Sequence, residues 1–213
     1  MHIHRSIRAV VWSLAVLLSY SAGAQAQEPG WYLGGGAGIS VTDLDESFWI
    51  DNSVTSSGLD KSGIGYNFYG GYRLNRYFAL EVGYLRFADT VFTGSSNGQG
   101  SIWVQGPIEG RTELQGITLQ GVGLWPLFGG GLEFYLKGGM YMWDTLTDYS
   151  KTINDIHRFN DDGGSLIGGM GVEMSVWGDW RLRGEMQLTS VIFANRETVP
   201  AGIATIGLVH PLN

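Results

Sequence analysis

Residues 66–87 read YNFYGGYRLNRYFALEVGYLRF, and this stretch decides the fold class. On both sides of a predicted turn at Asn75 and Arg76, apolar residues recur at every second position, which is typical of β-strands. One face of the predicted hairpin is apolar, whereas the other carries Arg73 and Glu81. The sequence therefore predicts a β-hairpin, and the fold depends on which solvent its apolar face contacts.

The first 26 residues have the pattern of a secretory signal peptide. Arg5 and Arg8 precede a short apolar run, and small residues follow, so cleavage is expected after Ala26, with Ala24 as the alternative. The apolar run is too short for a spanning helix, which argues against an uncleaved anchor. Residues 27–213 are then one exported domain of 187 residues.

The composition of this domain excludes several classes of protein. Without the two arginines of the leader, 11 basic residues face 20 acidic ones, and a net charge of −9 argues against a nucleic-acid partner. The chain has no cysteine, so disulfides and thiol-bound zinc are excluded. No run of 18 apolar residues follows residue 26, which excludes a helical membrane protein.

Eight alternating segments follow one another along the chain, and the connections between them alternate in length. The predicted strands are 31–39, the two halves of 66–87, 111–126, 132–148, 165–177, 180–193 and 201–210. The long connections are 40–62, 88–110, 149–164 and 194–200, and the short ones are 75–76, 127–131 and 178–179. This parity predicts an all-β, eight-stranded antiparallel up-and-down transmembrane barrel with extracellular long loops and periplasmic termini.

Charged residues of both signs lie on the faces that such a barrel would turn inward. They are Arg73, Lys137, Arg181, Arg183, Glu81, Glu133, Glu173 and Glu185. Equal numbers of each sign suit a confined interior, because buried charges are tolerated when they are paired and hydrogen-bonded. A soluble barrel would instead turn these charges outward. Since an eight-stranded barrel is only just wide enough for its side chains, we expect no large pore.

Aromatic residues gather at the strand ends beside the short connections. They are Trp31, Tyr72, Tyr77, Phe78, Trp125, Phe134, Trp177 and Trp180. Membrane barrels carry girdles of aromatic residues where the strands meet the two membrane surfaces. We therefore predict that this set forms the periplasmic girdle.

Three motifs carry a resemblance to a known family: GWYLGGGAGIS at 30–40, YGGYRLNRYFALEVGYLRF at 69–87 and GVGLWPLFGGGLEFYLKGGMYMWD at 121–144. With them the chain resembles the outer-membrane β-barrel family typified by the transmembrane domain of outer membrane protein A. The resemblance implies a lumen of paired charges and contact with membrane lipid and lipopolysaccharide. It also implies insertion by the barrel-assembly machinery with periplasmic chaperones. The ending His210–Asn213 departs from the aromatic terminus usual in that family.

The leading functional prediction is a non-enzymatic protein with a structural role in the envelope and with surface loops for adhesion or host contact. The alternative is a narrow channel for ions or small solutes, whose conductance the lumen charges would set. A lipid-modifying enzyme would need a histidine with an orienting carboxylate, such as His157 near Asp155. No catalytic signature surrounds His157, so we expect a solvated loop histidine.

Two acidic segments are candidates for a metal site. They are Asp43, Asp45 and Glu46, and the run Asp161–Gly163. Neither has the spacing of a known calcium loop, so we expect no metal and no other cofactor. A divalent ion that bridges these segments to anionic lipid headgroups remains a hypothesis.

Overall fold

The computed structural model describes residues 29–127, 131–150, 158–192 and 198–212. The predicted signal peptide and His157 lie outside the described residues. The elements are β1 (Gly30–Thr42), the 3-10 helix η1 (Glu46–Phe48), β2 (Val54–Asp60), β3 (Ser62–Asn75), β4 (Phe78–Arg86), β5 (Thr90–Ser96), β6 (Gly106–Leu127), β7 (Leu132–Tyr149), β8 (Arg158–Trp177), β9 (Trp180–Ile192) and β10 (Thr198–Leu212). In the described ranges, no helix has the length and hydropathy needed to cross a membrane.

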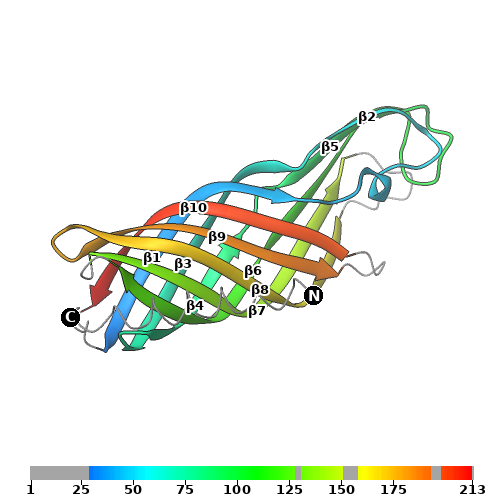
Figure 1. Ribbon diagram of the computed structural model, residues 1–213. Helices are drawn as coiled ribbons and strands as arrows, with labels where there is room; N and C mark the ends of the chain where they lie inside the picture. The colour runs from blue at the N-terminus through cyan, green and yellow to red at the C-terminus, as the bar shows by residue number, and fades with distance from the viewer. Residues whose placement is uncertain (1–28, 128–130, 151–157, 193–197, 213) are drawn as a thin grey trace, which may run out of the picture.

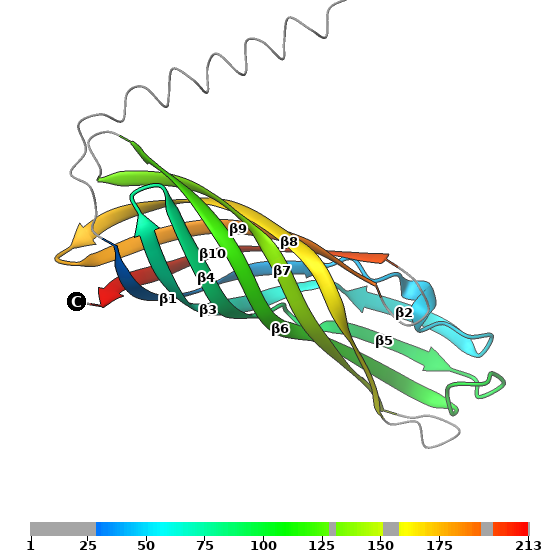
Figure 2. The ribbon, with the colours of Figure 1, turned by 90° about the horizontal axis from the view of Figure 1, so that it is seen from below.

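Eight of these strands form a closed antiparallel barrel (Figure 1). Around the barrel the order is β1, β3, β4, β6, β7, β8, β9 and β10, and pairing of β10 with β1 closes it. Each strand pairs with its sequence neighbour among the barrel strands, which confirms the predicted up-and-down topology. The β3–β4 and β8–β9 turns lie at the end of the barrel that holds the C-terminus (Figures 1 and 2).

The other end of the barrel continues into a projecting sheet. β2 leads directly into β3 and pairs with β5, which in turn pairs with the outer half of β6. The outer halves of β7 and β8 continue this sheet, which extends beyond the ends of β1, β9 and β10 (Figure 2). We call strands β2 and β5 with the outer halves of β6, β7 and β8 the projecting sheet.

The structure corrects several boundaries that the sequence predicted. Segments 40–62 and 88–110 were expected to be loops, yet they contain β2, β5 and the start of β6, and β8 begins within the predicted loop 149–164. The missed strands are rich in serine, threonine and glycine, so no apolar alternation marks them. Cross-strand pairing with neighbours in the projecting sheet holds them instead.

The first hairpin turn is also shifted by one residue from the prediction. The turn residues are Arg76 and Tyr77, and Asn75 ends β3. The Asn75 Oδ1 atom accepts hydrogen bonds from the backbone N–H groups of Tyr77 (2.8 Å) and Phe78 (3.0 Å). An asparagine that binds the backbone two residues ahead initiates a turn after itself, which explains the shift.

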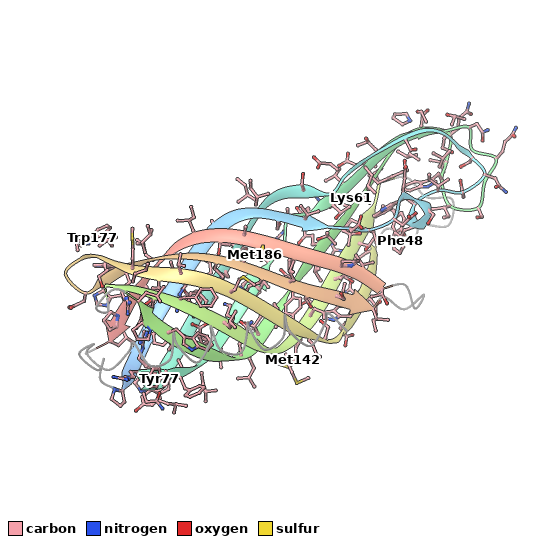
Figure 3. All side chains as sticks on the ribbon, viewed as in Figure 1. Phe48, Lys61, Tyr77, Met142, Trp177 and Met186 are labelled. Carbon is pink, nitrogen blue, oxygen red and sulfur yellow. The ribbon has the colours of Figure 1, made fainter. Side chains whose placement is uncertain are left out.

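The two faces of the barrel wall have the polarity of a membrane barrel. On β4, Leu80 and Val82 face outward and are 51% and 55% exposed, whereas Glu81 between them is 1% exposed. Met142 and Met186, labelled in Figure 3, also lie on the outward face. A soluble barrel would show the reverse arrangement. The apolar face of the hairpin at 66–87 therefore suits lipid.

Glycines on the inner wall make room for tyrosine rings. The Tyr32 ring lies so close to Gly71 that a Cβ atom there would stand 2.2 Å from it, and Tyr135 covers Gly171 in the same way. In each pair the ring and the glycine are on adjacent strands, β1 with β3 and β7 with β8. At these two positions glycine leaves the room that a tyrosine ring needs against the wall of a narrow interior.

Candidate functional site

The interior of the barrel holds all eight charged residues that the sequence assigned to inward faces. They are Arg73 on β3, Glu81 on β4, Glu133 and Lys137 on β7, Glu173 on β8, and Arg181, Arg183 and Glu185 on β9. Each side chain is at most 8% exposed. The period-two alternation of the strands places them there, because charged and apolar residues occupy alternate positions.

One half of this charge network lies toward the short turns. Arg73 makes a bidentate pair with Glu133, with nitrogen–oxygen distances of 3.1 and 2.9 Å. Arg181 bridges the two carboxylates of this region, 3.0 Å from Glu133 and 3.0 Å from Glu173. The bidentate geometry fixes both the position and the orientation of the Arg73 guanidinium.

Arg183 joins this half to the rest of the network. Its Nε atom donates to Glu173 at 2.7 Å and its Nη1 atom donates to Glu81 at 2.6 Å. Its guanidinium lies 4.7 Å from the ring centroids of both Tyr69 and Tyr135, within cation–π range. Every positive charge that faces this centre is therefore compensated by a carboxylate, and Arg183 also by aromatic faces.

Lys137 links Glu81 to Glu185, with its Nζ atom 2.6 Å from Glu185 and 3.5 Å from Glu81. The ion pairs link all eight charges in a path of alternating sign: Arg73, Glu133, Arg181, Glu173, Arg183, Glu81, Lys137 and Glu185. A further pair of Arg183 with Glu185 at 4.0 Å closes the end of this path into a ring. Each buried charge therefore has at least one neighbour of opposite sign, which lowers the cost of its burial.

Neutral side chains, which the prediction of the site did not include, complete the network. The Tyr32 hydroxyl donates to Glu81 at 2.8 Å, and Tyr135 donates to Glu185 at 2.8 Å. Asn67 and Gln187 also donate to Glu185, at 2.9 and 2.6 Å. All of these residues share the inward alternation of the charged set, so the same period could have identified them.

The space left inside the network is small. A cavity of about 20 Å³ lies near its short-turn end, room for about one water molecule. Its lining residues are Tyr32, Arg73, Glu173, Arg181, Arg183, Val209 and Pro211. The interior at this level is thus filled by side chains, as expected for eight strands.

Toward the other end, the interior becomes apolar and ends in a cluster of aromatic rings. We call Trp49, Phe92, Trp103 and Tyr149 the aromatic cap. Trp49 and Trp103 come from the segments 43–53 and 97–105 that precede β2 and β6, and both are completely buried. Trp49 stacks on Phe92 with ring centroids 5.7 Å apart, and the Trp103 Nε1 atom donates to the Trp49 carbonyl at 2.8 Å.

Asp51 joins the two segments that supply the tryptophans. Its Oδ2 atom accepts from the backbone N–H groups of Ser101 (2.9 Å) and Ile102 (2.7 Å), while its Oδ1 atom accepts from the N–H group of Ser53 (2.9 Å). Partial burial acts to raise the pKa of Asp51, but bonds from Ser53, Ile102 and Ser101 outweigh burial and lower it below the usual carboxyl range. The ionised carboxylate therefore holds the cap segments together.

Acid is expected to release this junction. Because the folded-state pKa of Asp51 is lowered, its stabilising contribution is present above the ordinary carboxyl value of about 4 and is lost as the pH falls below it. The amide proton shifts of Ser101 and Ile102, followed by NMR in micelles, should titrate together with a midpoint below about 4. Asp51→Asn should remove this step, and a midpoint at or above 4 would contradict the assignment.

The predicted girdle residues lie on the outward face at the short-turn end. Trp31 and Tyr72 face each other across β1 and β3 with ring centroids 4.9 Å apart. The other cross-strand ring pairs are Trp125 with Phe134 at 6.0 Å and Trp177 with Trp180 at 6.5 Å. Tyr77 lies in the β3–β4 turn, and Phe78 is 58% exposed beside it. Trp177 and Tyr77 mark this end in Figure 3.

In the two candidate metal segments, the acidic side chains have other roles. Asp43 pairs with Lys61 at 2.8 Å, and Asp45 accepts a hydrogen bond from the Ser47 N–H group at the start of η1. Asp161 and Asp162 lie within β8 rather than in a loop, which corrects the prediction. In the described part of the chain, no three potential ligands gather to hold a metal. His210 packs against Trp180, with ring centroids 4.6 Å apart.

Comparisons with known proteins agree with this architecture. The model of a family described as the OmpA-like transmembrane domain matches residues 26–211. The structure of Neisserial surface protein A has a TM-score of 0.57 and 14% identity, over 88% of this chain and 99% of that chain. Ail, the attachment invasion locus protein of Yersinia pestis, solved with the heparin analogue sucrose octasulfate, has a TM-score of 0.52 and 13% identity, over 87% and 100%. At such identities the likeness shows the fold alone. No curated protein matches the sequence.

Proposed function

The chain belongs to the family of OmpA-like transmembrane domains and is an outer-membrane β-barrel, and we propose that it is a non-enzymatic protein with a structural role and a surface-contact role. In this proposal the short turns and the C-terminal end face the periplasm. The outward apolar face contacts lipid and lipopolysaccharide. The projecting sheet then stands on the extracellular side, where it is available to other molecules.

We also propose that the barrel does not conduct ions, and its filled interior is the observation that supports this. An ion path through the barrel would have to cross the charge network, where the cavity beside Arg73 and Arg183 has room for about one water. It would then have to cross an apolar region that includes Leu85, Phe87 and Leu114, each at most 1% exposed, and the aromatic cap beyond. Hydrophobic constrictions exclude water and ions unless they open. These two barriers in series favour a structural element over the alternative of a channel.

The charge of the loop side favours some partners over others. The described residues at the loop-side edge of the outward apolar face of the barrel, and beyond that edge, include 12 acidic and 4 basic ones. The acidic ones are Asp43, Asp45, Glu46, Asp51, Asp60, Asp89, Glu109, Glu113, Asp144, Asp148, Asp161 and Asp162, and the basic ones are Lys61, Arg86, Arg111 and Arg158. A polyanion such as the heparin analogue bound to Ail would meet net repulsion here. A protein partner on the host surface suits this side better.

Two measurements test the proposal. Planar-bilayer recording of the purified chain is expected to show no steady open conductance, and cells that display the chain are expected to attach to host cells more than cells that lack it. A steady conductance that changes in the Lys137→Ala variant would contradict the structural role and favour a channel. Attachment equal to that of cells without the chain would contradict the contact role.

A further inference from the structure

Strand β2 forms a free edge of the projecting sheet. Its residues Val54–Asp60 pair with β5 on one side, and among the described residues no strand pairs with its other side. In an edge strand, about half of the backbone N–H and C=O groups point away from the sheet and remain open to a further strand. This edge lies far from the end that holds the C-terminus (Figures 1 and 2).

The edge is also accessible and unprotected. Four consecutive residues, Thr55, Ser56, Ser57 and Gly58, are exposed. Proteins usually block free edges with lysine, proline or bulges, but β2 contains neither residue and its one register shift lies between Val54 and Ser56 at the outer tip. An unblocked edge of this kind is a template for another extended chain.

The sheet behind β2 fixes the conformation of this strand. Leu59 packs against the apolar core, and Phe92, opposite it on β5, is completely buried. β5 pairs in turn with β6 along residues 106–112, and β6 pairs with β7. Because the template is already ordered, a partner strand would lose conformational entropy on its own side only.

A second copy of this chain does not fit the edge. Two copies in one membrane are related by an axis along the membrane normal. Antiparallel pairing of an edge with its own copy needs a two-fold axis perpendicular to the strands, whereas barrel strands tilt by only about 35–45° from the normal. Charge also opposes the pairing of two copies, because the loop side of each copy has an excess of acidic residues and the two would repel.

We propose that the free edge of β2 binds an extended segment of a partner protein that carries lysine or arginine side chains, by addition of a strand to the sheet. Backbone hydrogen bonds to β2 hold the segment, and the acidic surroundings, including Asp60 within β2, select its charge. This inference rests on the proposed surface-contact role and specifies its partner.

Peptide binding to the full chain in nanodiscs tests the inference directly. The probe is a fluorescent peptide of ten residues in which lysine and threonine alternate, and binding is measured by anisotropy. A peptide with two prolines in place of central threonines should bind about tenfold more weakly, since it lacks one or two of the hydrogen bonds of a strand. A peptide with glutamate for lysine should not bind. Equal binding of the proline peptide would show charge attraction without strand addition and would overturn the proposal.

Substitutions in the protein locate the site. Successive residues of a strand direct their N–H groups to opposite sides, so one of Ser56→Pro and Ser57→Pro removes a donor from the free edge without removing one from the β5 pairing. That variant should keep the melting temperature and lose binding about tenfold. Asp60→Asn should weaken binding, whereas Asp179→Asn, the same charge change in the β8–β9 turn, should not. Unchanged binding in both proline variants would overturn the proposal.

Attachment assays separate this inference from the contact role. If both proline variants still attach to host cells and bind the peptide as the parent does, the β2 edge is not the site, while the contact role stands. If the parent does not attach but binds the peptide at the β2 edge, the contact role fails, while the edge assignment stands.

Discussion

Replacing Glu81 by alanine is expected to lower the free energy of unfolding by roughly 3–5 kcal/mol, the usual cost of removing one member of a buried ion pair. Glu81 is 1% exposed and accepts from Arg183 at 2.6 Å and from Tyr32 at 2.8 Å, with Lys137 at 3.5 Å. Its removal leaves two positive charges with one carboxylate fewer in a buried site. Urea unfolding of the chain in lipid vesicles, followed by heat-modifiable gel migration, measures the change.

An exposed ion pair provides the matched control for Glu81→Ala. Asp43 pairs with Lys61 at 2.8 Å, and the two side chains are 67% and 34% exposed. Asp43→Ala also removes one carboxylate from one pair, but solvent screens the remaining charge, so the expected cost is about 0–1 kcal/mol. Similar losses in the two variants would show that the charge network does not stabilise the barrel more than a surface pair does.

Replacing Trp49 by alanine is expected to cost about 3–5 kcal/mol, as for other fully buried tryptophans. Trp49 is completely buried, stacks on Phe92 and holds Trp103 through its carbonyl group. Loss of the ring should also loosen the segments 43–53 and 97–105, because it removes the surface on which they meet. Chymotrypsin should then cleave within these segments faster than in the parent chain, and unchanged cleavage would contradict the role of the aromatic cap.

Two glycines on β6 provide an independent test of the packing around Trp49. A Cβ atom on Gly110 would stand 2.2 Å from the Trp49 ring, whereas one on Gly121 would find its nearest neighbour at 3.9 Å. Gly110→Ala should therefore displace Trp49 and increase cleavage in the cap segments, with a loss of about 1–3 kcal/mol from overpacking. Gly121→Ala should leave both measurements unchanged. Equal effects of the two substitutions would contradict the packing of Trp49 on Gly110.

The sequence by itself determined the barrel, its strand order and the residues that face inward. Alternation with a period of two is a local property, so Arg73 and Glu81 could be assigned to an inner face from their neighbours alone. The alternation of long and short connections then determined the topology. These features follow from contacts within a strand or across one turn, which the order of residues specifies directly.

Only the tertiary structure decided which charges pair and what closes the loop end. Arg73 and Glu133 are 60 residues apart, and Arg183 and Glu81 are 102 apart, so their pairing depends on the register and closure of the whole barrel. Trp49 and Trp103 lie in segments whose composition predicts polar loops, and the sequence of β2 has no alternation of apolar and polar residues. Their burial and pairing depend on surfaces that distant strands supply, and no local pattern records such surfaces.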